Sequence, residues 1–249
     1  MKKLRTFLYG LSGVALTLGL GTALPANATV TQGDASAYAV QGDILGSPVI
    51  GPLPYSSVSG SGSDSDSILD VSAGPLHVGA LNSSAFSNVD GSPGPKEASS
   101  SASILDVDFA LNHLMGLSFD VISSNSSVTG DAGSFSATGN SSIVNLTGFG
   151  LLSGLNGITI TGAPNQTLLN LAGIEVIANR QTSACSSFDC AITTDALYVD
   201  VLGQANVTLA SSTAHLAAPV PEPTTMAMMM VGIAGLGSRL RKKKAAATV

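Results

Sequence analysis

The stretch that decides the fold class reads Ile104-Leu105-Asp106-Val107-Asp108-Phe109-Ala110-Leu111. Apolar side chains occupy every second position of this stretch, and two carboxylates stand between them. Successive side chains of a β-strand point to opposite faces of the sheet, so the alternation indicates a half-buried strand. We therefore expect Leu105, Val107 and Phe109 to be buried, and Asp106 and Asp108 to be exposed.

The same two-residue period returns further along the chain. It is found at 117–122, 158–161, 174–176, 197–201 and 206–209. In the clearest of these runs we expect Leu197, Val199 and Val201 to be buried and Asp200 to be exposed. Short strands separated by turn residues predict an all-β, sandwich-like antiparallel domain. A β-solenoid-like stack is the alternative, but a solenoid needs a fixed-period repeat, and we find none in the sequence.

The charges of the chain are segregated. Of its 249 residues, most basic ones lie at the two ends. Between Thr29 and Val220, Lys96 and Arg180 stand against fifteen acidic residues, which gives a net charge of −13. Such a surface repels a phosphate backbone and excludes nucleic acid as a partner. With 44% hydrophobic and 10% charged residues, the chain is too apolar for a charge-driven disordered protein.

Residues 1–28 have the pattern of a secretory signal peptide. Lys2, Lys3 and Arg5 form a positive start, and residues 7–24 are uncharged and mostly apolar. The small residues at 26–28 fit a cleavage site, which predicts a cut after Ala28. An uncleaved N-terminal membrane helix is the alternative.

The C-terminal tail has three consecutive parts. The first is Val220-Pro221-Glu222-Pro223, and the second is the uncharged segment 224–238. The third is a basic block of Arg239, Arg241, Lys242, Lys243 and Lys244. Residues 224–238 predict a single transmembrane helix of roughly 22 Å, short of the ~30 Å hydrocarbon core. Positive charges stay in the cytoplasm, so the basic block should stop the tail there and leave the rest of the protein outside the inner membrane.

These three parts, in this order behind a signal peptide, resemble the PEP-CTERM sorting signal. The resemblance covers residues 219–244. It implies an exported protein of a Gram-negative bacterium that makes extracellular polysaccharide, and an exosortase-type enzyme that processes the tail. An ordinary C-terminal tail anchor is the alternative.

Between the two ends we expect two parts. Residues 29–103 are rich in Gly, Ser and Pro, and we expect loops at 41–62 and 88–103. Residues 104–218 carry the alternating pattern and should form the β domain. The motifs of this second part are Asn179-Arg180-Gln181, Thr194-Asp195-Ala196-Leu197-Tyr198-Val199 and Val207-Thr208-Leu209-Ala210-Ser211. With them, residues 100–216 resemble the choice-of-anchor P domain, an exported bacterial module without an established activity.

Cys185 and Cys190 are the only cysteines of the sequence. In an oxidising compartment we expect a disulfide that closes the turn between strands at 174–180 and 194–202. So short a loop limits the stabilisation to roughly 2 kcal/mol. Free thiols and a metal site are the alternatives, although zinc needs more ligands than this pair supplies.

Candidate catalytic or metal-binding residues are sparse. Asp64 and Asp66 resemble half of a calcium loop that lacks its Gly and closing Glu. Asp106 and Asp108 suit a glycosidase pair only loosely. The histidines are His77, His113 and His215, and no Gly-x-Ser-x-Gly or His-Glu-x-x-His motif accompanies them in the exported part. We expect no cofactor and no metal.

The sequence thus predicts a non-enzymatic protein of the cell surface or extracellular matrix. It would be held briefly in the inner membrane, processed at its tail and released or attached outside the cell. Its β domain would contact extracellular polysaccharide or neighbouring proteins. The alternatives are an extracellular carbohydrate-active hydrolase and a calcium-dependent adhesin.

Overall fold

Strands β1 to β12 and one 3-10 helix make up the part of the chain that the structure describes. This computed structural model describes residues 29–43, 50–73, 76–111, 114–203 and 205–220. Residues Thr29–Pro219 form one compact unit. The expected signal peptide at 1–28 and tail helix at 224–238 lie outside the described residues. Within those residues, no helix is long and apolar enough to cross a membrane.

Most strands are long and follow one another with short connections; the exceptions are the short strands β8 and β9 and the longer segment between them, residues 151–165. Their bounds are β1 Gln32–Asp43, β2 Ile50–Ser59, β3 Ser61–Ala73, β4 Leu76–Asn88, β5 Lys96–Leu111, β6 Met115–Asp131, β7 Ser134–Val144, β8 Thr147–Gly150, β9 Gln166–Leu171, β10 Ile174–Cys185, β11 Asp189–Val201 and β12 Ala205–Ala217. The 3-10 helix is Ser153–Leu155.

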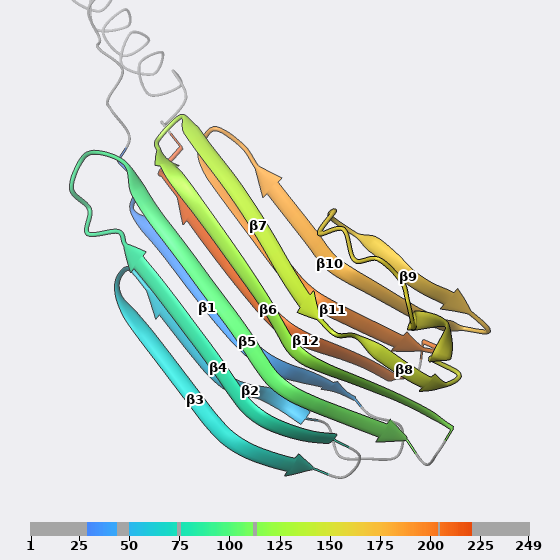
Figure 1. Ribbon diagram of the computed structural model, residues 1–249. Coiled ribbons are helices and arrows are strands. Elements are labelled where there is room, and N and C mark those ends of the chain that lie inside the picture. The colour runs from blue at the N-terminus through green and yellow to red at the C-terminus, as the bar shows by residue number, and fades with distance from the viewer. Residues whose placement is uncertain (1–28, 44–49, 74–75, 112–113, 204, 221–249) are drawn as a thin grey trace, which may run out of the picture. The chain divides into compact units, whose positions relative to one another are not determined.

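The strands form two antiparallel sheets that stack face to face as two layers (Figure 1). Sheet A has the order β2-β1-β12-β11-β10-β9, so the first and the last strand of the fold are neighbours. Sheet B is the meander β3-β4-β5-β6-β7, and β8 pairs with the first residues of β6. The predicted all-β sandwich is confirmed.

A row of residues crosses each sheet where the inside–outside alternation reverses, and we call the two rows together the kink row. In sheet A it comprises Pro54, Ala39, Ala210, Ala196 and Asn179, and in sheet B Asp70, Gly79, Asp106, Asp120 and Asn145. Alternate strands adopt left-handed backbone there, as at Asp106 with φ 53° and Ala210 with φ 50°. Asp and Asn tolerate this region better than most residues, so the polar members suit their places.

The kink row corrects one expectation. On β5, the buried positions are Ala102 and Ile104 before the row and Val107 after it. Leu105 was expected inside, but it is 37% exposed because the turn of the backbone at Asp106 reverses the alternation. Val107 is buried and Phe109 packs partly buried against the core, as predicted.

The expected strand at 158–161 was wrong, because these residues lie between β8 and β9, but the other expected positions mostly hold. Leu197 and Val201 are buried, and Val199 is partly buried against the same core. Asp106 and Asp108 are exposed, whereas Asp200 is half-buried.

On one side of the kink row the interior is aliphatic, and we call this side the aliphatic half. Its core includes Val107, Leu117, Phe119, Val176 and Leu197. The same cluster reaches across the row as far as Leu81, Ile104 and Ile122. Burying large apolar side chains gives about 1.5–3 kcal/mol each, so most of the hydrophobic stabilisation belongs here.

On the other side, which we call the serine half, a layer of buried hydroxyls follows. Along β6, the inward residues run from Ile122 through Ser124 and Ser126 to Val128, which belongs to a second, smaller apolar cluster. The layer comprises Ser56, Ser83, Ser100, Ser124, Ser126, Thr194 and Ser212.

The serine layer joins the two sheets by hydrogen bonds. Ser100 Oγ of β5 donates to the carbonyl oxygen of Thr213 in β12 at 2.8 Å, and Ser126 Oγ lies 2.9 Å from the carbonyl oxygen of Ser212. Because a serine side chain is short, its hydroxyl reaches the backbone of the opposite sheet only if the two sheets lie closer than the ~10 Å usual for packed sheets. Gly139 agrees, since a Cβ there would lie 2.2 Å from Thr194 Oγ1.

Two expected loops are strands instead. The expectation at 41–62 was wrong for β2, and the one at 88–103 was wrong from Lys96, where β5 begins. The proposed boundary between residues 103 and 104 falls inside β5. Serine is common in turns, and here a serine-rich sequence lines both faces of a sheet instead.

Candidate functional site

The outer face of sheet B in the serine half carries a regular array of small polar side chains, which we call the hydroxyl grid. Every second residue of five neighbouring strands faces outward, and nearly all are Ser, Thr or Asn. Its rows are Ser67, Asn82, Ser103, Ser123 and Ser142; Ser65, Ser84, Ser101, Asn125 and Asn140; Ser63, Phe86, Ser99, Ser127 and Thr138; and Ser61, Asn88, Glu97, Thr129 and Ser136. Glu97 is the grid's one charged member.

Neighbours in a row bond to each other. The Ser84 and Ser101 hydroxyls lie 2.8 Å apart, and Asn88 Oδ1 accepts the backbone N–H of Glu97 at 2.7 Å. Neighbouring side chains within a row are separated by the strand spacing of about 4.8 Å, and successive rows lie about 6.8 Å apart along a strand. The grid therefore presents donors and acceptors at fixed intervals on a regular surface.

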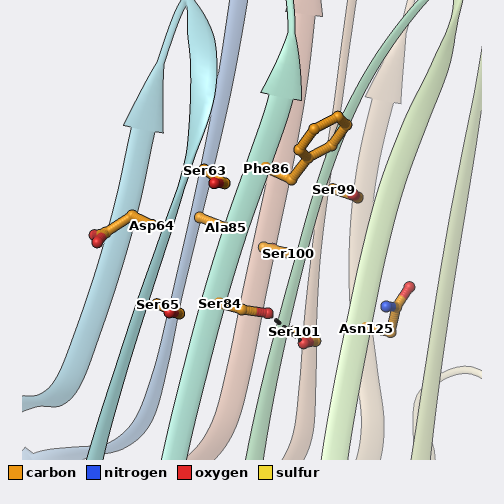
Figure 2. Close-up of a pocket in the computed structure, with 10 residues that line it drawn as sticks. All are labelled: Ser63, Asp64, Ser65, Ser84, Ala85, Phe86, Ser99, Ser100, Ser101 and Asn125. Atoms are coloured by element: carbon orange, nitrogen blue, oxygen red, sulfur yellow. Dashed lines mark hydrogen bonds between the residues drawn. The ribbon is translucent and has the colours of Figure 1, made fainter.

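A shallow depression of about 270 Å³ lies in the middle of the grid (Figure 2). Phe86, which is 42% exposed, stands at one side of it, and Ser99, Ser101 and Asn125 line it from β5 and β6. An aromatic ring among hydroxyls, one amide and the Asp64 carboxylate offers both apolar contact and hydrogen bonds.

Sequence reasoning missed the grid. The signal was present, because Ser, Thr or Asn occupies every second position at 61–67, 99–103, 123–129 and 136–142. We interpreted the first stretch mainly as half of a calcium loop and the second by its turn composition, although a polar two-residue period also fits a strand whose outer face is uncharged.

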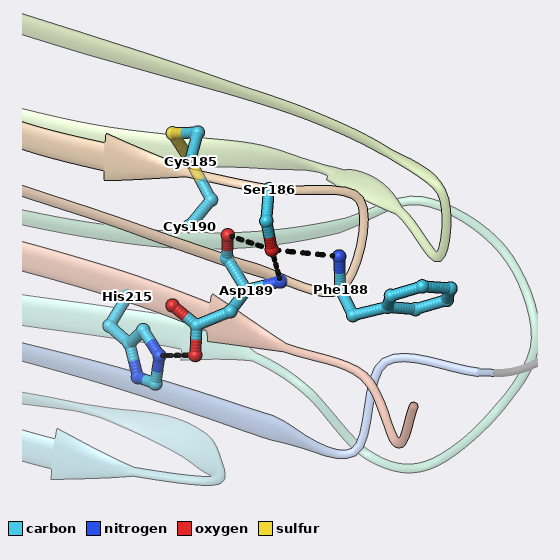
Figure 3. The surroundings of a disulfide bond; sticks show 6 residues. All are labelled: Cys185, Ser186, Phe188, Asp189, Cys190 and His215. Atoms are coloured by element: carbon cyan, nitrogen blue, oxygen red, sulfur yellow. Dashed lines mark hydrogen bonds and ion pairs between the residues drawn. A yellow bond between two sulfur atoms is a disulfide. The ribbon is translucent and has the colours of Figure 1, made fainter. Parts of the chain in front are cut away.

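The predicted disulfide is confirmed. Cys185 and Cys190 are bonded at 2.01 Å and face each other at the end of the β10–β11 hairpin (Figure 3). Ser186 Oγ accepts the backbone N–H groups of Phe188 and Asp189 within the enclosed loop, at 3.2 and 3.1 Å. Cys190 is fully buried in the smaller apolar cluster, so the bridge fixes the end of the serine half.

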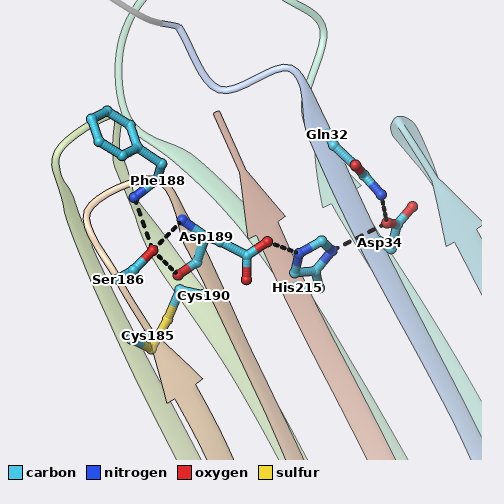
Figure 4. A network of polar contacts seen from close by, with 8 residues as sticks. All are labelled: Gln32, Asp34, Cys185, Ser186, Phe188, Asp189, Cys190 and His215. Atoms are coloured by element: carbon cyan, nitrogen blue, oxygen red, sulfur yellow. Dashed lines mark hydrogen bonds and ion pairs between the residues drawn. A yellow bond between two sulfur atoms is a disulfide. The ribbon is translucent and has the colours of Figure 1, made fainter. Parts of the chain in front are cut away.

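His215 links three strands near that end (Figure 4). Its ring nitrogens lie 3.3 Å from Asp34 of β1 and 3.1 Å from Asp189 of β11. Partial burial raises the pKa of the Asp34 carboxyl, but hydrogen bonds from Ser59, Gln32 and His215 outweigh it and hold that pKa below its ordinary value. Carboxylates on both sides make His215 a bridge between strands rather than half of a Ser–His pair.

The candidate carboxylates are dispersed. Asp64 lies in strand β3, not in a loop, and accepts the backbone N–H of Ser57 at 2.9 Å. Asp106 lies in the kink row and Asp108 further along β5. His77 Nδ1 lies 2.9 Å from Ser72 Oγ. Among the described residues, no three His, Cys, Asp or Glu side chains gather as metal ligands would. His113 lies outside those residues.

The sorting residues fall almost wholly outside the described structure. Val220 is described and is 66% exposed. Pro221, Glu222, Pro223 and the basic block Arg239, Arg241, Lys242, Lys243 and Lys244 lie beyond it. Their assignment therefore depends on the sequence alone, where a comparison with known families is informative.

Residues 219–242 match the PEP-CTERM protein-sorting motif. This motif implies export, transient membrane anchoring and sorting by exosortase. The match contains the Val220 to Pro223 segment and ends at Lys242, before the last two lysines of the basic block. No curated protein and no solved structure matches the chain. The resemblance of residues 100–216 to the choice-of-anchor P domain thus stays a prediction.

Proposed function

We propose that this protein is a non-enzymatic component of the cell surface or extracellular matrix, sorted and processed at its PEP-CTERM tail, whose hydroxyl grid binds extracellular polysaccharide. The sorting motif at 219–242 carries the first half of this proposal. The grid supports the second half, because its side chains match the hydroxyl groups of a sugar chain.

The chemistry of the grid favours a neutral, hydroxyl-rich partner. Each neutral hydrogen bond contributes only about 0.5–1.5 kcal/mol net. Many equivalent bonds along one chain add up through multivalency. The strand spacing of about 4.8 Å is close to the length of one sugar residue in an extended chain. Phe86 adds an apolar surface against which a sugar ring can pack.

Sorting is tested by the replacement Glu222→Ala. Proline disfavours helix at the residue before it, so the sequence predicts extended backbone at Glu222, before Pro223, which a processing enzyme can engage. We expect the parent to lose an epitope placed after Val249 and to keep one near Thr31, and the variant to retain both. A variant that matures like the parent would contradict the role of Glu222. A C-terminal epitope on mature surface protein would show an ordinary tail anchor instead.

Polysaccharide binding is tested by Asn125→Asp at the centre of the grid. The change keeps the shape of the side chain and replaces two donors by a negative charge, so retention on polysaccharide from the producing cells should fall about tenfold, equivalent to 1.4 kcal/mol. Asn170→Asp, on an exposed position of β9, is the matched control. Equal retention of both variants would contradict binding by the grid. Loss of binding on calcium chelation would favour the calcium-dependent adhesin.

A further inference from the structure

The outer face of sheet A has a second cavity, of about 350 Å³. Unlike the hydroxyl grid, it is lined by aromatic rings, amides and an arginine. Tyr38, Gln41, Arg180, Tyr198, Asn206 and Thr208 line it. It straddles the kink row, with Tyr38 and Arg180 on the serine side and Gln41, Tyr198 and Thr208 on the aliphatic side. Because the alternation reverses there, two outward rows from different halves face the same hollow.

Arg180 is the central group of this cavity. Its Nε and Nη2 donate to Asp195 Oδ2 at 2.8 and 2.6 Å, and its guanidinium carbon lies 3.7 Å from the centre of the Tyr198 ring. Asp195 is itself buried, and its other oxygen accepts from Ser211 Oγ at 2.7 Å. The guanidinium is thus held in one orientation by an ion pair below and an aromatic ring beside it.

The held guanidinium keeps unused donors. A guanidinium has five N–H groups in a planar fork, and the bonds to Asp195 use two of them. The Arg180 side chain is 35% exposed, whereas Lys96, the other cation between Thr29 and Val220, is 6% exposed and paired with Asp90. Arg180 is therefore the accessible Lys or Arg side chain of the described residues.

The remaining lining groups are neutral and bond well to hydroxyls. Burial raises the pKa of the Tyr38 phenol, which therefore stays protonated, with Ser211 and Thr208 beside its oxygen. Gln41 and Asn206 each supply an amide with donors and an acceptor. Two aromatic rings, two amides and a hydroxyl surround a single fixed cation.

We propose that this cavity binds one sugar residue that carries a carboxylate, a uronic acid. The carboxylate would accept hydrogen bonds from the outward N–H groups of Arg180, and the ring hydroxyls would bond to Gln41, Asn206 and Tyr38. The cavity falls within the range of about 300–1,000 Å³ that holds small ligands. This inference goes beyond the proposed function, because the site uses neither the tail nor the grid.

The surrounding charge gives the site a direction. Asp200 and Glu175 lie in the same outward row as Asn206, whereas Arg180 stands at the opposite side of the kink row. A ligand carboxylate therefore meets the outward N–H donors of the Arg180–Asp195 pair at one end and is repelled by Asp200 and Glu175 at the Asn206 end. A neutral sugar would lose the contact with Arg180 that distinguishes the two ends.

The test is calorimetric titration of the full-length protein in detergent with galacturonate and with galactose, which differ in the carboxylate. Galacturonate should bind at least about tenfold more tightly, equivalent to 1.4 kcal/mol. Arg180→Lys keeps the charge but loses the planar fork, so the preference for galacturonate over galactose should disappear. Equal binding of the two sugars, or no binding of galacturonate, would overturn the proposal.

A second variant guards against misfolding of the first. Asn206→Ala leaves the Arg180–Asp195 pair untouched and should lower the affinity for both sugars several-fold. Asn170→Ala, on the exposed β9, should change neither. A galacturonate affinity unaffected by Asn206→Ala would also overturn the site. A trisaccharide of galacturonate separates the sources of the ligand: tighter binding than the monomer identifies a polymer chain, and equal binding identifies a free uronic acid.

Discussion

The two halves of the sandwich are built from the same strands but held together differently. In the aliphatic half, large side chains such as Leu117, Phe119 and Leu197 fill the space between the sheets. In the serine half, the small side chains of alanine and serine allow the two sheets to approach so closely that serine hydroxyls bond to the backbone of the opposite sheet. Apolar burial stabilises without direction, whereas a buried hydrogen bond fixes a geometry. The half with less hydrophobic material is thus the half that carries the ordered outer face.

The largest expected difference compares two fully buried leucines. Leu197→Ala, in the aliphatic half, should lower the free energy of unfolding by about 4 kcal/mol. Leu216→Ala, in the smaller cluster of the serine half, should lower it by about 2.5 kcal/mol because fewer large neighbours lose contacts. Urea denaturation of both variants measures the difference. Equal losses would show that the halves share one core in energetic terms.

The disulfide gives the next effect. Reduction of Cys185–Cys190 should lower the free energy of unfolding by roughly 2 kcal/mol, since it releases a short loop in the unfolded chain. Denaturation with and without reductant measures this loss, and a Cys185→Ser variant should not respond to reductant. Titratable thiols in the exported, unreduced protein would contradict the bridge.

Two serines on one strand separate hydrogen bonding from packing. Ser126 Oγ contacts both Thr194 Oγ1 and Ser212, whereas Ser124 Oγ has no partner among the described residues. Ser126→Ala should cost about 1.5 kcal/mol, because it leaves a buried hydroxyl unpaired. Ser124→Ala should be neutral or stabilising. If thermal unfolding shows equal effects, cross-sheet bonding is not what holds the serine half.

The kink row predicts a smaller difference between two facing alanines. Ala210 has φ 50°, whereas Ala196 opposite it has no positive φ. Glycine relieves the left-handed strain of about 1–2 kcal/mol at the first position only. Ala210→Gly should therefore be about 1 kcal/mol more stable than Ala196→Gly. Identical unfolding midpoints would mean that the kink stores no strain.

The smallest effect is expected in acid. Hydrogen bonds from Lys96 and Ser92 hold the pKa of the Asp90 carboxyl well below its ordinary 3.8. A carboxyl with a lowered pKa in the folded state stabilises above 3.8 and loses that contribution as the pH falls below it. Asp90→Asn should thus flatten the fall of Tm below pH 3.8. A Tm profile parallel to that of the parent would contradict the pairing.

The fold could be predicted where the period of two is apolar, and not where it is polar. Val107 and Leu197 were predicted correctly because large alternating residues have few other structures open to them. Leu105 was predicted wrongly, since nothing in the sequence marks Asp106 as a left-handed residue. Ser63 to Ser67 was interpreted as half of a calcium loop around Asp64 and Asp66, although it lies in strand β3. The cavity around Arg180 is formed by residues of four strands, so no local sequence pattern predicts it.

The adjacency of β1 and β12 has a mechanical consequence. Gln32 pairs with Ala217, and β12 is bonded on its two sides to β1 and β11. A pull on the chain after Ala217, resisted by a ligand held on sheet B, acts along the axis of β12. It loads both ladders in shear, so many hydrogen bonds must break together. A pull that separates the two chain ends would instead peel β1 from β12 one bond at a time. The fold is thus strong against tension applied through one end and weak against tension applied between both ends.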